Sequence, residues 1–243
     1  MARPFKGIIH GDTGTGKSEL SKTLSYVCRT LYLCFDMSAP HVLQGRGAAP
    51  HIELPIQNDS IIREITSFEQ IREARNWLLG KGKGVVGGVV LDSIGQGVSS
   101  RRVEVSGSNI DHIVKVKNYT WGQIKEEYRL FTDCVMRIPD LHALLIAGSR
   151  RTADSIEPGP FDPDTNQYRN YTIVPAIETG LRDEIGYYCT DMGYCYKAGS
   201  RSDVHYFITF SRVGIDTKLT GPNKIIDMEN PTFEKILAVI NKE

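Results

Sequence analysis

The residues best suited to chemistry lie near the amino end, in the stretch GIIHGDTGTGKSEL at 7–20. Its glycines, lysine and serine fit the spacing Gly-x-x-x-x-Gly-Lys-Ser, which is typical of a loop that binds the phosphates of a nucleotide. Glycines let successive backbone N–H groups converge on phosphate oxygens, and a following helix adds the positive end of its dipole. The residues expected to contact the nucleotide are Gly11, Asp12, Thr13, Gly14, Thr15, Gly16, Lys17, Ser18 and Glu19.

Side chains of this loop and of one later segment could divide the chemistry between them. Lys17 would reach the β- and γ-phosphates, and Ser18 would bind Mg²⁺ through its hydroxyl. Asp92 ends the apolar run at 84–93 (GVVGGVVLDS), and in enzymes with this loop an aspartate at such a strand end holds Mg²⁺. We therefore expect Ser18 and Asp92 to bind the metal, with Lys17 and Asp92 in catalysis. The alternative for Asp92 is a cap at the strand end.

The elements around the loop have the order that a phosphate-binding loop requires. An apolar run at 7–9 predicts a strand before the loop, and a helix begins near Lys17. The apolar face of that helix consists of Leu20, Leu24, Val27 and Cys28. Without this strand, loop and helix in sequence, the pattern would be only a glycine-rich turn with a surface lysine.

Helix and strand patterns alternate through the first 150 residues. Buried strands are predicted at 30–36, 84–93 and 141–150. Helices are predicted at 67–80 and 120–138, and each opens with a Ser/Thr-x-x-Gln capping box, so that Thr120 would cap the second. Near-continuous apolar strands between helices indicate a parallel sheet that is covered on both faces.

The last part of the chain follows a different pattern. The alternating segment 203–211 is predicted to pair with 192–198 as an antiparallel hairpin across the turn GSRS. The segment NPTFEKILAVI predicts a final helix with Asn230 as its cap and Pro231 at its first position. Together the patterns predict one α/β domain over 1–243, with a mostly parallel sheet, helices on both faces and a carboxyl-terminal hairpin.

Composition sets limits on partners and location. With 29 basic and 29 acidic residues the formal net charge is zero, so contact with nucleic acid or a membrane must come from local patches. Hydrophobic residues make up 40% of the chain, which supports a substantial core. The five cysteines are odd in number and form no Cys-x-x-Cys pair, and we expect neither a secretory leader nor a membrane span. We expect a cytoplasmic protein with reduced thiols.

The order of these motifs resembles that of the RecA-like P-loop ATPases, in particular the short phage-encoded group of nucleotide-binding or single-strand-annealing ATPases. The matching segments are GDTGTGKS, LYLCFD, VVLDS, the helix that opens with TW, ALLIAGSR and FSRVGIDTKLTG. The resemblance implies a RecA-like core, Mg²⁺-dependent ATP hydrolysis and self-assembly into a homo-oligomeric ring or filament. It also implies action on single-stranded DNA during recombination, in the host-cell cytoplasm if the chain is phage-encoded.

One position departs from the pattern of that family. The strand after the P-loop helix usually ends Asp-x-Glu there, and the glutamate orients the attacking water. This chain has Asp36, Met37 and Ser38 instead, so hydrolysis is expected to be slow. Asp36 is the favoured replacement and Glu53 a second candidate, while the alternative for Asp36 is a cap of the loop.

The resemblance implies further catalytic residues. Ser149, next to Arg150 at the end of a buried strand, would sense the γ-phosphate. Arg212 or Lys218 would neutralise charge on the phosphate bound by a neighbouring subunit, although both are alternatively surface charges. His10, beside the P-loop, is expected to pack at the strand end rather than to catalyse.

Two loops, near 95–120 and 150–175, are expected from the resemblance to contact single-stranded DNA. Both combine cations, which bind phosphates, with aromatic rings, which stack on bases. Acidic residues in the second loop favour the alternative of a solvated surface. The cations and rings are Arg101, Arg102, Lys115, Lys117, Arg150, Arg151, Arg169, Tyr119, Tyr168 and Tyr171.

Two other functions fit the same P-loop. A P-loop kinase would phosphorylate a nucleoside or a small metabolite, and it would need an arginine-rich lid and an acceptor pocket. A non-hydrolysing assembly or DNA-binding module would hold ATP as a structural ligand, and the serine at position 38 favours that possibility.

Overall fold

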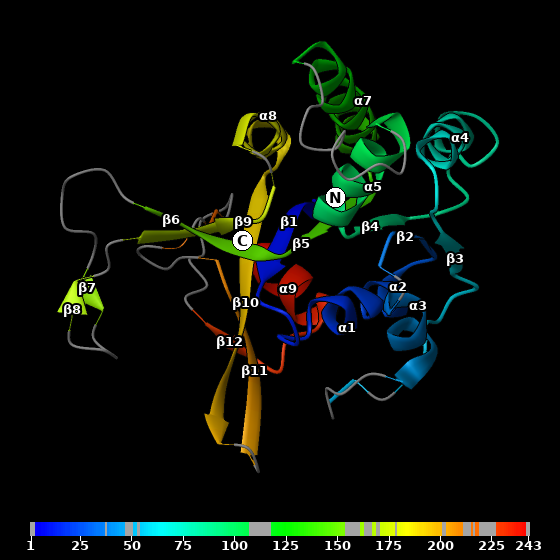
Figure 1. Cartoon of the computed structure of the whole chain (residues 1–243). Coiled ribbons are helices and arrows are strands. Elements are labelled where there is room, and N and C mark those ends of the chain that lie inside the picture. Colours follow the sequence, from blue (N-terminus) through cyan, green and yellow to red (C-terminus); the bar gives the residue numbers. More distant parts are fainter. Residues whose placement is uncertain are drawn as a thin grey trace.

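Eight strands form one sheet at the centre of the molecule, in the order β12-β11-β10-β1-β5-β4-β2-β3 (Figure 1). This computed structural model describes residues 3–36, 38–46, 51–52, 54–106, 118–153, 161–162, 167–168, 171–177, 179–200, 203–210, 215, 217–218 and 227–241. The strands of the sheet are β1 (Lys6–Gly11), β2 (Thr30–Cys34), β3 (Ile61–Glu64), β4 (Gly88–Asp92), β5 (His142–Ala147), β10 (Asp191–Ser200), β11 (Asp203–Thr209) and β12 (Met228–Glu229).

The strands from β10 to β3 all run parallel to one another. β1 lies between β10 and β5, where Ile8 is opposite Met192 on one side and Leu145 on the other. Burial on both faces explains why β1, β2, β4 and β5 read as near-continuous apolar runs. Because these strands are parallel, their carboxyl ends meet at one edge of the sheet, where such sheets hold their ligands.

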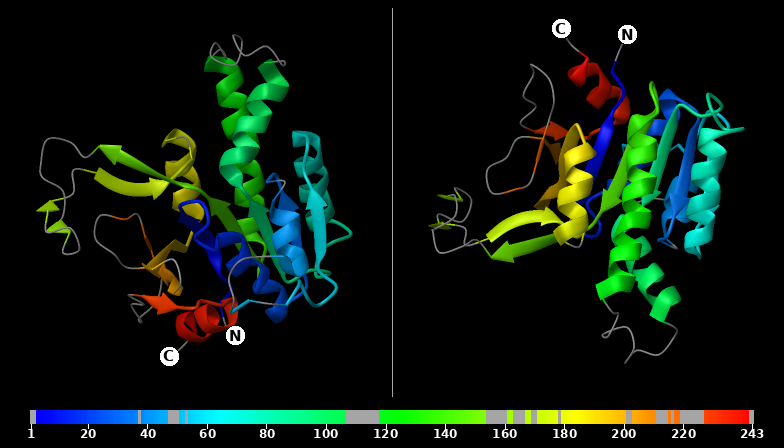
Figure 2. Two further views of the ribbon diagram at one scale, coloured as in Figure 1. Left: turned by 60° about the horizontal axis from the view of Figure 1, so that its bottom comes forward. Right: turned by 90° about the horizontal axis from the view of Figure 1, so that it is seen from above.

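Helices cover both faces of the sheet and enclose two hydrophobic cores (Figures 1 and 2). Ile8 points into one core and its neighbour Ile9 into the other. Among the described residues, no helix combines the length and the apolar content that crossing a membrane requires. One face carries α4 (Phe68–Leu79), α5 (Ile94–Ser106), α7 (Asn118–Arg137) and α8 (Thr179–Tyr188), and the other carries α1 (Lys17–Lys22), α2 (Leu24–Val27), α3 (Ala39–His41), η1 (Val42–Arg46) and α9 (Phe233–Ile240).

The predicted hairpin at the carboxyl-terminal side is confirmed. β10 and β11 pair antiparallel from Tyr194 opposite Thr209 to Ser200 opposite Asp203. Gly199, beside the turn, has a φ of 105°, and a Cβ there would lie 2.0 Å from the carbonyl oxygen of Asp203. The turn therefore requires glycine at that position. Figure 1 shows the hairpin extending well beyond the neighbouring strands.

The second predicted DNA loop contains regular structure, contrary to expectation. β6 (Ser149–Ala153) pairs antiparallel with β9 (Tyr171–Pro175), and β7 (Phe161–Asp162) pairs with β8 (Gln167–Tyr168). Figure 1 shows β6 and β9 as a ribbon that projects from the sheet, with β7 and β8 beyond it. The β-branched residues of β6 and β9 favour the extended backbone, although proline and glycine elsewhere in the segment suggested a loop.

The final helix begins later than predicted. Thr232 is the residue before α9, and its side-chain oxygen accepts a hydrogen bond from the backbone N–H of Lys235 (3.3 Å). Asn230 is therefore not the cap and Pro231 is not the first helical residue. Asn230 has a φ of 46°, and its N–H donates to the carbonyl oxygen of Tyr206 (2.8 Å), which ties it to the hairpin instead.

Two more helix predictions need correction. α7 begins at Asn118, so Thr120 lies inside the helix and does not cap it. The helix after the P-loop is broken at Thr23, whose N–H bonds the carbonyl of Leu20 (3.0 Å), and continues as α2. Leu20 and Leu24 are buried as predicted, but the side chain of Val27 is 40% exposed because the segment ends there.

Candidate nucleotide site

Residues 12–16 connect the carboxyl end of β1 to the first turn of α1, in the order that the sequence predicts. Gly14 and Gly16 have φ values of 76° and 80°, a region that glycine adopts without the penalty of a Cβ. At Gly11 a Cβ would lie 2.3 Å from the carbonyl oxygen of Cys195 on β10. The backbone therefore requires all three glycines, and it presents the loop at a helix N-terminus, which favours anions.

Lys17 lies across this loop. Its Nζ donates to the carbonyl oxygens of Gly11 (2.8 Å) and Asp12 (2.6 Å). Burial lowers the pKa of Lys17, although Asp92 and other anionic groups oppose that shift. The Thr15 hydroxyl also donates to the carbonyl of Asp12 (2.8 Å), so the loop is braced from two sides. An ammonium group held inside the loop in this way is placed to meet a polyphosphate.

Ser18 and Asp92 meet across the pocket, as the sequence predicts for two ligands of one metal ion. The Ser18 hydroxyl donates to Oδ2 of Asp92 (2.6 Å). Asp92 is 4% exposed at the end of β4, and its peptide bond to Ser93 is cis. Burial raises the pKa of Asp92 to about 6, the hydrogen bond from Ser18 lowers it, and the charge of Asp36 raises it further.

This pair of oxygen donors fits Mg²⁺. Mg²⁺ is commonly bound by one or two protein oxygens, with waters and substrate phosphates completing its octahedron. Among the residues that the structure describes, no cluster of three or more metal-binding His, Cys, Asp or Glu side chains occurs. The charge of Asp92 is costly to bury, and a divalent cation at this place would balance it.

The loop and the strand ends enclose a pocket of about 700 Å³. Such a volume is within the range of small-molecule and cofactor sites. The pocket lining does not include Gly11, Asp12 or Thr15, which instead make hydrogen bonds within the loop. The lining includes Thr13, Gly14, Gly16, Lys17, Ser18, Glu19, Asp36, Ser38, Asp92, Ser93, Gln96, Gly148, Ala176 and Tyr206.

Asp36 reaches the pocket from the segment after β2, but one of its oxygens is already engaged. Oδ1 of Asp36 accepts hydrogen bonds from the N–H (2.8 Å) and the hydroxyl (2.7 Å) of Ser38. This is the geometry of a local turn cap, which was the alternative for Asp36. Its catalytic role stays a prediction, and Glu53, the second candidate, lies outside the described residues.

Ser149 lies beside the P-loop strand rather than in the pocket lining. Its hydroxyl oxygen is 3.0 Å from Nδ1 of His10, the second-last residue of β1. His10 is fully buried and its ring lies 5.3 Å from that of Tyr194, which confirms the expected packing role. Gly148, just before Ser149, does line the pocket, so β6 starts directly at the site. Phosphate sensing by Ser149 stays a prediction.

The two cations proposed to act on a neighbouring subunit have different outcomes. Arg212 lies outside the described residues. Lys218 lies at the other end of the sheet from the P-loop: its backbone pairs with Met192 near the start of β10, and its Nζ donates to the carbonyl of Cys189 (2.8 Å). Lys218 therefore does not reach the site of its own chain, and a role at a neighbour's site stays a prediction.

The first predicted DNA loop is largely helical where the structure describes it. Arg101 and Arg102 lie in α5, and Lys115 and Lys117 lie outside the described residues. Arg101 forms ion pairs with Glu104 and Glu127, each at 3.0 Å. Arg101 is thus engaged within the chain, and the expectation of a cation in a loop is wrong for this residue.

Two residues outside the sequence motifs face the P-loop from the hairpin. Lys197 and Tyr206 are cross-strand partners on β10 and β11. A Cβ on Gly16 would lie 3.0 Å from the ring of Tyr206, and one on Gly14 would lie 3.8 Å from Nζ of Lys197. The alternation of side chains along β11 could have predicted this position. Ile208 is buried in the core beside α1, and side chains two residues apart on a strand point to the same face, so Tyr206 lies on that face as well.

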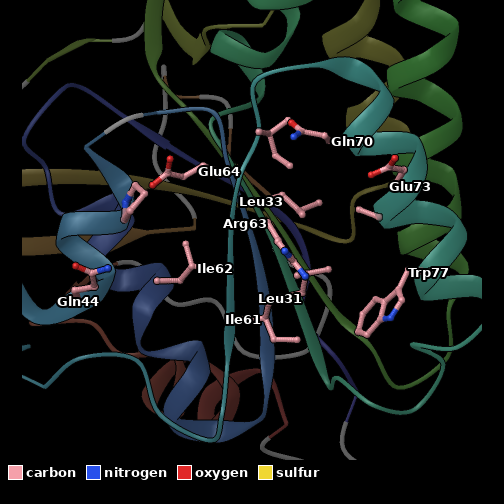
Figure 3. A pocket seen from close by; sticks show the side chains of 13 residues that line it. Leu31, Leu33, Gln44, Ile61, Ile62, Arg63, Glu64, Gln70, Glu73 and Trp77 are labelled. Atoms are coloured by element: carbon pink, nitrogen blue, oxygen red, sulfur yellow. The ribbon is translucent and has the colours of Figure 1, made fainter.

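A second pocket, of about 690 Å³, lies beside the outermost strand β3 (Figure 3). Trp77 of α4 lines it together with Leu33 and Ile61 of the sheet, and the described lining includes no residue of the P-loop. Arg63 and Glu64 place charges on this strand, a feature that discourages pairing with another strand. The described residues of the P-loop therefore line the first pocket and not this one.

The comparisons with known proteins establish the fold. No protein-family model and no curated protein matches the chain. The RadB recombinase, a solved structure, is similar over 92% of this chain and 84% of its own, with 16% identity and a TM-score of 0.50. The flagellar accessory protein FlaH from Methanocaldococcus jannaschii is similar over 93% and 85%, with 11% identity and a TM-score of 0.46. With the mostly parallel sheet, the likeness to RadB confirms the predicted RecA-like α/β fold.

Proposed function

We propose that this chain is a Mg²⁺-dependent ATPase that acts on single-stranded DNA in recombination or strand annealing. The observation that carries the proposal is the meeting of Lys17, Ser18 and Asp92 around one pocket, at the end of a glycine loop that the backbone requires. The fold shared with a protein named as a recombinase supports the DNA part of the proposal. A homo-oligomer, ring or filament, belongs to the same proposal.

Each of these residues has a distinct task. The loop amides and Lys17 hold the triphosphate, with the ammonium group against the β- and γ-phosphates. Ser18 and Asp92 would hold the metal ion. A bound Mg²⁺ would neutralise the negative charge that develops on the phosphates during hydrolysis. Such a site works by positioning and charge stabilisation, so it needs no nucleophilic side chain of its own.

Tyr206 is proposed to support the nucleoside end of the ligand. Its half-buried ring lies against Gly16 and lines the pocket beside Glu19. Stacking of a base on an aromatic ring is worth about 1–3 kcal/mol. We expect Tyr206→Ala to weaken the binding of Mg²⁺-ATP about tenfold, and Tyr206→Phe to bind as the wild type does. Titration with a fluorescent ATP analogue measures both.

Inorganic tripolyphosphate is the control ligand for Tyr206, because it has the phosphates but no base to stack. Its affinity should be equal in the wild type and in Tyr206→Ala. If both ligands lose affinity to the same degree, Tyr206 only shapes the loop through Gly16, and its assignment to the base is wrong.

The ribbon of β6 and β9 is proposed to contact DNA. It carries Arg150 and Arg151, and it begins one residue after Gly148 of the pocket lining. The contact between Ser149 and His10 joins the start of this ribbon to the P-loop strand. A change at the γ-phosphate could therefore reach the ribbon through a short, packed path.

Hydrolysis assays with and without a single-stranded oligonucleotide test the proposal, with a duplex of equal length as the control. We expect slow release of phosphate from ATP, accelerated by the single strand and not by the duplex. Transfer of phosphate to a nucleoside or metabolite would instead establish the kinase. Tight ATP binding without turnover, with or without DNA, would establish the non-hydrolysing module and refute the ATPase.

A further inference from the structure

ATP hydrolysis in this pocket requires a group that orients the attacking water. At the position where the ATPases that the sequence resembles carry a glutamate, this chain has Ser38. Ser38 is turned back on Asp36, to which it donates two hydrogen bonds. A serine hydroxyl is a poor base, and the turn engages one oxygen of Asp36. The remaining polar side chains of the pocket are therefore the candidates for orienting the water.

Among these side chains, Gln96 lies on the segment that follows Asp92 and carries a carboxamide, which can both accept and donate hydrogen bonds. It lines the pocket from the first turn of α5, four residues after Asp92 and three after Ser93. The Ser93 hydroxyl donates to Oε1 of Gln96 (3.2 Å), and the backbone N–H of Gln96 donates to the same hydroxyl (3.4 Å). These two contacts attach Gln96 to the residue that follows the metal-binding aspartate.

The helix that carries Gln96 is held firmly. On its inner face, Ile94 is fully buried and Val98 is 4% exposed. One turn further, Arg101 pairs with Glu127 of α7 through two hydrogen bonds of 3.0 and 3.1 Å. A side chain that must orient a water molecule benefits from such a rigid base, because small displacements of the reacting groups are costly.

We infer that Gln96 orients the attacking water, an inference that rests on the ATPase proposed above. The carboxamide retains an acceptor lone pair for a water proton and two N–H donors for a phosphate oxygen, and it adds no negative charge. The water oxygen forms a bond to the γ-phosphorus while the bond to the bridging oxygen of ADP breaks. The water proton passes to a γ-phosphate oxygen, and ADP leaves with the bridging oxygen. A protein glutamine performs this kind of orientation in other P-loop enzymes.

The test is steady-state and single-turnover hydrolysis by Gln96→Ala, Gln96→Glu and Ser100→Ala. For Gln96→Ala we expect kcat to fall roughly 100-fold, with KM and the affinity for a fluorescent ATP analogue changed by no more than about twofold. Gln96→Glu keeps the side-chain length and an oxygen acceptor, so it should recover much of the lost rate. Ser100→Ala, an exposed position on the same helix, should match the wild type.

Three results would overturn the inference. If the wild type hydrolyses ATP and Gln96→Ala hydrolyses it equally fast, another group orients the water. If Gln96→Ala raises KM and leaves kcat unchanged, Gln96 binds substrate and does not orient water. If the wild type itself shows no turnover, the proposed ATPase fails first and the inference fails with it.

Discussion

Lys17→Ala is expected to weaken the binding of Mg²⁺-ATP by roughly 100-fold, since hydrogen bonds from a charged donor are worth about 1.5–3 kcal/mol each. The variant loses the ammonium group that is proposed to contact the phosphates. It also loses the two hydrogen bonds that brace the loop at Gly11 and Asp12. Titration with a fluorescent ATP analogue measures the affinity, and the shift of Tm with ligand gives an independent value, because the stabilisation grows with the logarithm of one plus the ratio of free ligand concentration to Kd.

Lys83→Ala is the matched control for this experiment. Lys83 is an exposed lysine in the turn before β4 and lies outside the pocket lining. It should bind nucleotide as the wild type does, and both variants should keep the circular dichroism of the folded protein. An unchanged affinity in Lys17→Ala would refute the assignment of the phosphate site, and the functional proposal would go with it.

Asp92→Asn is expected to lower the rate of ATP hydrolysis by roughly 100-fold, while a fluorescent ATP analogue still binds in the absence of Mg²⁺. Asparagine keeps the size of the side chain and can still accept the hydrogen bond from Ser18, but it removes the charge that is proposed to bind the metal. It also removes the cost of burying that charge, so the Tm without ligands should not fall.

The dependence on Mg²⁺ separates a metal ligand from a strand cap. For Asp92→Asn the additional rise of Tm that Mg²⁺ gives in the presence of ATP should disappear. Asp140→Asn, at an exposed position in the turn before β5, should keep it. If Asp92→Asn retains both the hydrolysis rate and the Mg²⁺-dependent stabilisation, Asp92 only caps the strand and the metal site lies elsewhere.

The parts of this molecule that could be predicted from the sequence are those in which a local pattern has a single structural solution. The P-loop spacing leaves little freedom, because Gly14 and Gly16 take positive φ and Gly11 touches the backbone of β10. Likewise, the short valine-rich run of β4, preceded by glycines, favours a strand buried on both faces, and its last residue, Asp92, then falls at the edge of the sheet where such folds bind ligands.

The errors occur where a distant segment decides the outcome. Asn230 is a good helix cap by type, but the hairpin binds its N–H and the helix begins after Thr232. Arg101 was expected to be available to DNA, but it is paired with Glu127, which lies 26 residues later in the chain, on α7. Tyr206 belongs to no motif and reaches the P-loop only because β11 pairs with β10. None of these contacts is encoded in a short stretch of sequence.

The position of β1 in the sheet has a consequence for how the protein is made. It precedes the other strands of the sheet in the chain, yet its two partners are β5 and β10, which emerge from the ribosome much later. Until residue 195 is available, the carbonyl that packs against Gly11 does not exist, so the nascent P-loop lacks its neighbour on β10. Nucleotide can therefore stabilise the chain only after β10 has been made, and ribosome-bound chains that stop before β10 should remain open to proteases with or without ATP.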